Sequence, residues 1–111
     1  MVLSWDSPGT ADGQFGPNGP EGITVDSEGR VYVADTMNNR VQVFDSNGTF
    51  LIKWGTTGTG PGEFRRAEDV TVDSNGYNSV SDGSNNRIQK FGYLPTPTNH
   101  STWGHLKSLY R

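Results

Sequence analysis

An acid and a base that recur together are the residues of this chain most suggestive of chemistry. Asp35 precedes Arg40 by five residues in the stretch DTMNNRVQVF, and the stretch DGSNNRIQKF repeats the pattern 47 residues further along. A carboxylate and a guanidinium at this spacing can form a charge-assisted ion pair or contribute to a catalytic site. A structural pair must recur once in each repeated unit, whereas a catalytic pair need not. We therefore interpret the repeated pair as part of a structural corner.

The corner needs a tight turn between its acid and its base. We expect the Asp35 carboxylate to accept hydrogen bonds from backbone N–H groups of the 36–39 turn. We also expect Asn38 or Asn39 to adopt the left-handed backbone conformation. In its two copies, the predicted structural corner comprises Asp35, Asn39, Arg40, Asp82, Asn86 and Arg87.

Other candidates for chemistry are weak. His100 and His105 lie in the C-terminal tail, and the chain has no cysteine that would complete a zinc site with them. The DSEG stretch at 26–29 is similar to the start of a calcium loop, but it enters a strand before the later ligands of such a loop. The glycine-rich stretch 55–62 lacks the lysine and the following helix of a phosphate-binding loop. We expect no metal, no cofactor and no enzyme activity.

Charge and composition restrict the class of partner. The 111 residues carry a formal net charge of −3, and the nine lysines and arginines are scattered except for Arg65 and Arg66. Nonspecific binding of nucleic acid requires clustered cations, so we do not expect a nucleic-acid partner. No apolar run is long enough to span a bilayer, and the opening stretch lacks a signal-peptide pattern. We expect a soluble chain that does not bind membranes and leave its compartment open. Asn47 and Asn99 stand in glycosylation sequons, which matter if that compartment is extracellular.

An internal repeat sets the architecture. Residues 19–44 match residues 66–91 in strict register. Stretches 26–29 and 45–48 predict hairpin turns, in which Asp accepts a hydrogen bond from the backbone two residues on and Gly supplies a positive φ. The strands predicted in the first unit are 22–26, 30–35, 40–45 and 50–54.

A partial copy precedes the first unit. LSWDSPGTADGQF near the start lies over IKWGTTGTGPGEF at 52–64. We therefore predict that a leading strand near Val2–Trp5, and a last strand at about 101–105, are equivalent to the fourth strand of the first unit. Large apolar residues mark these strands at intervals of 49 residues, namely Trp5, Trp54 and Trp103.

The stretch GITVDSEGRVYVADTMNNRVQVFDSNGTFLIKWGTTGTGPGEF resembles an NHL repeat. That family has a strand ending in Val-Asp, a glycine turn, a Tyr-Val-Ala-Asp strand, an Asn-Asn-Arg corner and a glycine-rich linker after the fourth strand. The match is close over 13–64 and loose over 65–91. NHL repeats build β-propellers, usually six-bladed. The resemblance implies an all-β chain of two four-stranded antiparallel propeller blades plus one extra strand, completed by oligomerisation or by a longer chain.

This interpretation divides the chain into three parts. Residues 1–15 form the leading strand and linker of a preceding repeat, 16–64 form one blade, and 65–111 form a second, degenerate blade with an irregular tail. The second copy places polar residues where the first has apolar ones, and burying them unpaired would cost several kcal/mol. We expect them to be hydrogen-bonded, exposed or at a partner surface, in a terminal blade or alternatively in a specialised interface. The replacements are Asn78 for Val31, Ser79 for Tyr32, Ser81 for Ala34 and Lys90 for Val43.

Two blades cannot close a ring alone and leave apolar faces open to water. We predict a non-enzymatic NHL-like module that mediates self-assembly, as a homo-oligomer in a closed ring or an open filament, or protein–protein interaction. An extracellular structural filament built head to tail is the first alternative. The second is a lyase or lactonase-type enzyme whose metal site forms only on assembly, from Asp26, Asp69 or Asp73.

Loops before the first strand of each blade provide a candidate binding rim. We expect these loops and the corners at 36–39 and 83–86 to border the two faces of a ring. The candidate rim consists of Glu21, Arg65, Arg66 and Glu68.

Overall fold

The structure, a computed structural model, describes the backbone of residues 4, 7–93 and 106–110 and the side chains of residues 4 and 7–92. It is built on two four-stranded antiparallel sheets, so the predicted all-β class and the two four-stranded units are confirmed. The first sheet contains β1 (Gly22–Val25), β2 (Val31–Asp35), β3 (Arg40–Phe44) and β4 (Phe50–Trp54), in that order. The second sheet contains β7 (Ala67–Val72), β8 (Asn78–Asp82), β9 (Arg87–Tyr93) and β10 (Leu106–Tyr110), also in chain order.

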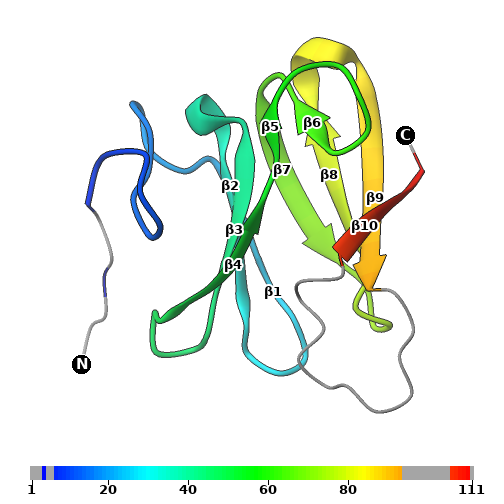
Figure 1. Cartoon of the computed structure of the whole chain (residues 1–111). Coiled ribbons are helices and arrows are strands. Elements are labelled where there is room, and N and C mark those ends of the chain that lie inside the picture. Colours follow the sequence, from blue (N-terminus) through cyan, green and yellow to red (C-terminus); the bar gives the residue numbers. More distant parts are fainter. Residues whose placement is uncertain (1–3, 5–6, 94–105, 111) are drawn as a thin grey trace.

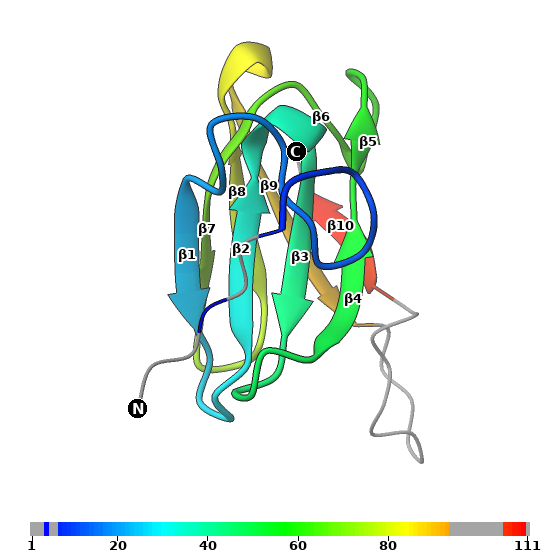
Figure 2. The same cartoon turned by 90° about the vertical axis from the view of Figure 1, so that its left-hand side faces the viewer.

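The two sheets stand side by side, with β1 next to β7 at one edge and β4 and β10 toward the other (Figures 1 and 2). In the segment that joins the two sheets, β5 (Thr56–Thr57) and β6 (Glu63–Phe64) pair in parallel. Single 3-10 turns, η1 (Thr36–Asn38) and η2 (Gly83–Asn85), join the second and third strands of each sheet. Both turns lie at the upper end in Figure 1, which we call the upper face. In the part of the chain that the structure describes, no helix is long and apolar enough to cross a membrane.

The fourth strand of the second sheet lies further along the chain than we predicted. β10 begins at Leu106, which pairs with Tyr93 of β9, so the prediction of a last strand at about 101–105 was wrong. The tryptophan spacing misled because the segment between the third and fourth strands is longer in the second unit than in the first. The predicted leading strand and the residues Trp5, Asn99, His100, Trp103 and His105 lie outside the described residues.

The hairpin turns at the lower end form as predicted. Asp26 Oδ1 accepts a hydrogen bond of 2.9 Å from the Glu28 backbone N–H, and Gly29 has a φ of 80°. The turns at 45–48 and 73–76 repeat this bond between Asp and the residue two positions on. A positive φ strains any residue with a Cβ, which explains the glycine in each turn.

The main core lies between the two sheets. Because side chains alternate along a strand, Tyr32 and Val43 of the first sheet face the second sheet and pack with Val70, Val80 and Phe91. Each buried apolar side chain of this size contributes about 1.5–3 kcal/mol, so the interface makes one packed unit of the two sheets. A smaller cluster on the opposite face of the first sheet consists of Phe15, Val31, Val33 and Phe44.

Gly22 permits a close approach between β1 and β7. A Cβ added at Gly22 would lie 2.6 Å from the Asp69 Cα and 2.8 Å from the Glu68 carbonyl oxygen. Real Cβ atoms do not come this near to backbone atoms. The absence of a side chain at Gly22 therefore lets the innermost strands of the two sheets meet.

Asn78 is a polar residue in the core. It lies on β8 opposite Val72 and Phe91, and it is fully buried. Among the described residues, neither its amide nitrogen nor its amide oxygen has a hydrogen-bond partner. Our expectation that the replaced side chains are hydrogen-bonded, exposed or at a partner surface was therefore wrong for this residue. A buried polar group without a partner costs about 1–3 kcal/mol.

We predict that Asn78→Val raises the free energy of unfolding by about 1–3 kcal/mol, because valine fills a similar volume and has no unmet hydrogen bonds. The first unit already has Val31 at the matching position. Chemical denaturation measures the change. Thr71→Val, which adds the same side chain at an exposed position of β7, is the control and should change stability little. An Asn78→Val protein no more stable than the wild type would contradict this reading of the core.

The lower turn of the first sheet contains an ion pair with a pH-dependent contribution. Arg30 Nε lies 2.7 Å from Asp26 Oδ2, and the Arg30 backbone N–H donates to Oδ1 at 3.0 Å. Burial alone would raise the pKa of Asp26. Hydrogen bonds from the Arg30 side chain and from the backbone of Arg30 and Glu28 outweigh burial and hold that pKa below its usual value.

A lowered pKa in the folded state stabilises the fold above the unfolded pKa of about 4 and loses this effect as the pH falls through the folded value. We therefore expect the stability difference between the wild type and Asp26→Asn to be largest near neutral pH and to shrink in acid. Denaturation curves at several pH values measure it. Asp45→Asn is the control. Asp45 begins a matching turn in which Thr49 stands in place of Arg30, so this variant removes the turn aspartate without removing an ion pair to arginine. A pH-independent difference for Asp26→Asn would contradict the assignment.

Candidate functional site

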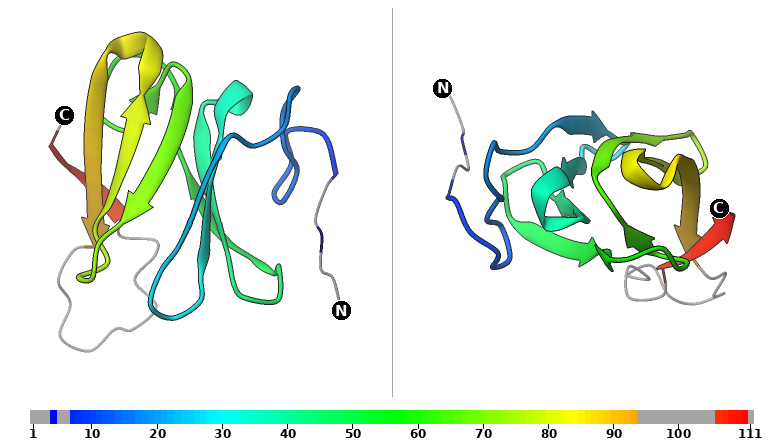
Figure 3. Two further views of the ribbon diagram at one scale, coloured as in Figure 1. Left: turned by 180° about the vertical axis from the view of Figure 1, so that it is seen from behind. Right: turned by 90° about the horizontal axis from the view of Figure 1, so that it is seen from above.

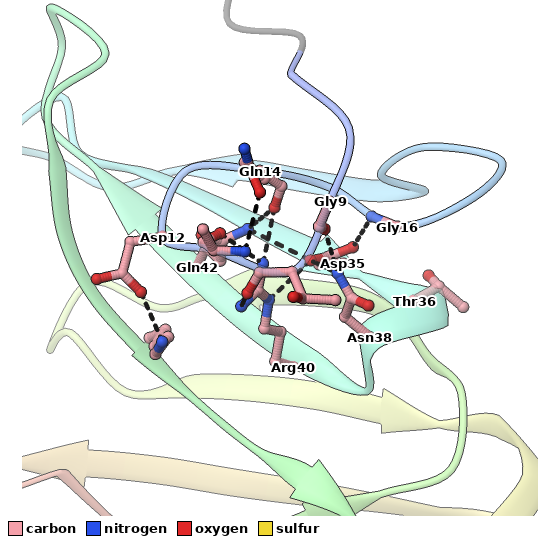
Figure 4. Close-up of polar contacts among 12 residues, drawn as sticks. Gly9, Asp12, Gln14, Gly16, Asp35, Thr36, Asn38, Arg40 and Gln42 are labelled. Atoms are coloured by element: carbon pink, nitrogen blue, oxygen red, sulfur yellow. Dashed lines mark hydrogen bonds and ion pairs between the residues drawn. The ribbon is translucent and has the colours of Figure 1, made fainter.

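The corner acid of the first sheet binds side chains and a distant backbone group. Asp35 is fully buried, and its Oδ2 accepts hydrogen bonds from Arg40 Nε at 2.8 Å and Asn38 Nδ2 at 2.9 Å. Its Oδ1 accepts from the Gly16 backbone N–H at 2.9 Å (Figure 4). The expectation that Asp35 binds backbone N–H groups of the 36–39 turn was therefore wrong. Asn39, left-handed with a φ of 54°, closes that turn with its own N–H.

Arg40 and Gln42 connect this corner to the segment that precedes the first sheet. Arg40 Nη1 donates to the Thr10 carbonyl at 2.8 Å, and Arg40 Nη2 donates to the Gln14 carbonyl at 2.7 Å. Gln42 Nε2 donates to the same Gln14 carbonyl at 2.7 Å, while Gln42 Oε1 accepts from the Gly13 N–H at 2.8 Å. We call the four side chains that hold this segment the linker clamp; in the first sheet they are Asp35, Asn38, Arg40 and Gln42.

The second sheet repeats the linker clamp on the segment 58–65, which joins the two sheets. Arg87 Nε donates to Asp82 Oδ2 at 2.9 Å, and Asp82 Oδ1 accepts from the Arg65 N–H at 2.7 Å. The same guanidinium also donates to carbonyl oxygens at 59, 60 and 63. The second linker clamp consists of Asp82, Asn85, Arg87 and Gln89.

Sequence reasoning missed half of each clamp. Asn38, Gln42 and their counterparts Asn85 and Gln89 were absent from the predicted corner, although both pairs recur at the same 47-residue spacing. That recurrence was the available signal. The Asp35 carboxylate accepts four hydrogen bonds and the Asp82 carboxylate accepts three, which is the arrangement of a structural support.

The upper face carries a pocket between the two corners. Its volume is about 340 Å³, and its lining joins the predicted Arg65 and Arg66 to the corner of the first sheet. We call it the rim pocket; its lining residues are Thr36, Met37, Asn39, Thr57, Arg65, Arg66 and Ser84. The two corners and the rim loop therefore border one face, and the expectation that they border two faces was wrong. The right-hand view in Figure 3 looks down on this face.

The four predicted rim residues are placed differently. Arg66 has a φ of 76°, its N–H donates to Asn39 Oδ1 at 2.8 Å, and its Nε lies 3.0 Å from Glu68 Oε2. Its charge is thus partly neutralised at the surface. Arg65 is exposed, and no ion pair is found for its guanidinium within residues 7–92. Glu21 is exposed but does not line the rim pocket.

Arg65 and Met37 give the rim pocket a mixed chemistry. Met37 is 44% exposed, and methionine adapts its shape to apolar partners. An arginine can bind a carboxylate through two parallel hydrogen bonds. The pocket can therefore accept a short acidic segment that also carries an apolar side chain.

The acidic residues proposed for a metal site do not gather. Asp26 and Asp73 belong to lower turns, and Asp69 lies beside Gly22 close to the start of β7. Within the described ranges, no group of three or more His, Cys, Asp or Glu side chains could hold a metal ion. Asn47 is exposed in its lower turn.

We predict that Arg87→Ala lowers the free energy of unfolding by about 3–5 kcal/mol, because it leaves the buried Asp82 carboxylate without its counter-ion. Three carbonyl groups of the linker lose their donor as well. Urea denaturation or protease resistance measures the loss. Arg66→Ala removes an exposed arginine of the same linker region and should cost no more than about 1 kcal/mol. Equal effects for the two variants would contradict the clamp.

Comparisons with known proteins agree with this architecture. A family model described as 6-bladed beta-propeller matches residues 21–94. Protein lin-41 of Caenorhabditis elegans is 48% identical over 52 residues, which are 47% of this chain and 4% of lin-41. NHL repeat-containing protein 3 of Homo sapiens is 44% identical over 64 residues, 55% of this chain and 18% of that protein.

Protein brain tumor of Drosophila melanogaster is also similar, at 40% identity over 50 residues, 45% of this chain and 5% of the relative. All these matches span less than a fifth of the relatives' own lengths. The repeated strands, the duplicated corner and the family match lead to one conclusion: the chain belongs to the 6-bladed beta-propeller family and is built from NHL-type repeats.

Proposed function

We propose that this chain is a non-enzymatic propeller module that binds another protein through the rim pocket. The observation that carries the proposal is the position of Arg65, an exposed cation that lines the same pocket as the 44% exposed Met37, between the two corners of the upper face. A rigid support under a surface pocket favours binding, because little conformational entropy is lost when the partner arrives. The linker clamp supplies that support, since Asp82 holds the Arg65 backbone.

The partner that fits the rim pocket is an acidic protein segment with one apolar side chain. Arg65 would bind its carboxylate, and Met37 would contact its apolar residue. The relative named E3 ubiquitin-protein ligase TRIM71 of Gallus gallus acts on proteins by its name, but the match covers only 6% of it. Its activity is therefore not carried over to this chain.

Self-assembly is the second candidate for protein binding. Ile23 and Val25 of β1 are 65% and 56% exposed on the face of the first sheet that is turned away from the second sheet. Such a face favours association, and a homo-oligomer could close as a ring or extend as a filament. Both forms require the face of one copy to meet the outer face of the second sheet in the next copy.

A peptide array of acidic segments that each contain one apolar residue tests the rim pocket, with the purified full chain as the probe. We expect Arg65→Ala to weaken the tightest peptide by about 10- to 100-fold, the loss of one charge-assisted contact. Lys53→Ala removes an exposed lysine of β4 and is the matched control, with unchanged affinity expected. Peptide affinity that is equal for the wild type and Arg65→Ala, or an array with no binder, would reject the rim.

A further inference from the structure

The face of the first sheet that is turned away from the second sheet is only partly covered. Figure 2 looks onto this face, where the segment before β1 crosses in front of β3 and β4. Phe15 of that segment packs on Phe44 of β3, with ring centroids 6.0 Å apart. On β1, Ile23 and Val25 remain exposed beside the buried Val33 and Val31. We call Ile23, Val25 and their neighbours Val31 and Val33 the open face.

The second sheet shows what covers the same positions. Ile23 pairs with Val33 in the first sheet, and the equivalent pair in the second sheet is Val70 with Val80. Val70 is 1% exposed, whereas Ile23 is 65% exposed. The two pairs belong to equivalent strands, but only the second pair is covered, because Val70 packs against the first sheet. In the second sheet, therefore, a neighbouring blade buries the row formed by Val70 and Val80.

The linker clamps point to the same occupant. Segment 58–65 leaves β4 of the covering sheet and is held on the second sheet by Arg87. Segment 9–16 is held on the first sheet by Arg40 through the same three kinds of carbonyl contact. It therefore lies over β3 and β4 beside the open face, in the way that segment 58–65 lies on the covered face of the second sheet.

The chemistry of a suitable occupant can be read from the cover of the second sheet. There the contacting side chains form cross-strand rows, Tyr32 with Val43 and Ala34 with Val41, and all are fully buried. One aromatic side chain, one small residue and two valines thus form a complementary apolar surface.

The outer face of the second sheet has this chemistry at only one of the four positions, Ile88, which is equivalent to Val41 and is 63% exposed. Ser79 and Lys90 form the row equivalent to Tyr32 and Val43, and Ser81 replaces Ala34. Lys90 Nζ lies 5.3 Å from the centre of the Tyr77 ring and 4.0 Å from Asp73 Oδ2, so the ammonium has an aromatic and an acidic partner at the surface. Burying this ammonium against valine and isoleucine would carry a large desolvation cost.

We propose that the open face binds a further propeller blade whose contacting surface is apolar and aromatic, and that the polar outer face of the second sheet prevents this chain from supplying that blade to a second copy of itself. The surface is separate from the rim pocket, so the proposal stands independently of the rim. The proposal also excludes a head-to-tail homo-oligomer, because Ser79 and Lys90 block contact with the open face of a second copy.

A donor variant of this chain supplies the missing surface. The donor carries Ser79→Tyr, Ser81→Ala and Lys90→Val, which reproduce the cover formed by the first sheet, together with Ile23→Glu, which blocks its own open face. Mixed with the wild type, the donor should form a complex of one donor and one wild-type chain in analytical ultracentrifugation. Wild type alone should stay at the 12.1 kDa of one chain.

Two controls make the result specific. Ile23→Glu in the wild-type partner should abolish the complex. Asn75→Ala in that partner should leave it unchanged, because Asn75 is exposed in the lower turn of the second sheet, away from the open face. Circular dichroism establishes that each variant folds. If the full donor does not fold, a donor with only Ile23→Glu and Lys90→Val removes the buried charge and should bind more weakly.

Three outcomes would overturn the proposal. The first is a folded donor that does not bind the wild type. The second is a wild-type protein that already forms head-to-tail oligomers, because the polar outer face would then be no barrier. The third is a wild-type dimer that Ile23→Glu dissociates, because a second copy would then cover the open face. Loss of the rim contact at Arg65 alters none of these masses, so the two proposals fail separately.

Discussion

The repeated contact between a buried aspartate and an arginine is the constraint on which the rest of the structure depends. In each sheet this pair ends the second strand, opens the third and extends to the backbone of the preceding linker. Each linker buries one phenylalanine, Phe15 or Phe64, but is otherwise rich in glycine and polar residues, so hydrogen bonds must hold the rest of it. The guanidinium is suited to this role because its donors form a rigid fork that several carbonyl groups can share. The clamp thereby sets where one sheet stands relative to the next and where the upper-face pocket forms.

The linker clamp is the same in both sheets, but the faces of the two sheets differ in polarity. The first sheet offers apolar surface on both sides, and one side is buried by the second sheet. The second sheet has an apolar side toward the first and a mostly polar outer side, where Ser79, Ser81 and Lys90 surround the exposed Ile88. Stacked repeat proteins require terminal units with a polar outer face. The same backbone therefore carries one unit suited to the interior of a stack and one suited to its end.

Much of this was accessible from the sequence, and the exceptions share a physical cause. Strands and turns follow from local patterns: a short apolar run for Val31–Asp35 and the Asp-to-Gly turns at the lower end. The pairing of Asp35 with Arg40 followed from the repeat, but the bond from the Gly16 N–H to Asp35 did not, because Gly16 lies 19 residues away and only the fold brings it near. The rim pocket combines Met37 with Arg65 from different repeats, so no local pattern contains it. Asn78 broke the apolar pattern visibly, but its burial without a partner depends on the packing of the other sheet.

The central claim is that the linker clamp joins linker and sheets into one cooperative unit, and native-state hydrogen exchange tests it most directly. The Arg65 and Gly62 amides donate to the clamp side chains Asp82 and Gln89. Their exchange should require the same free energy of opening as the amides in the middle of β8, because the clamp opens only when the sheets separate. The Asn75 amide, in an exposed turn, should exchange far more readily. Exchange of Arg65 and Gly62 as fast as that of Asn75 would contradict the account.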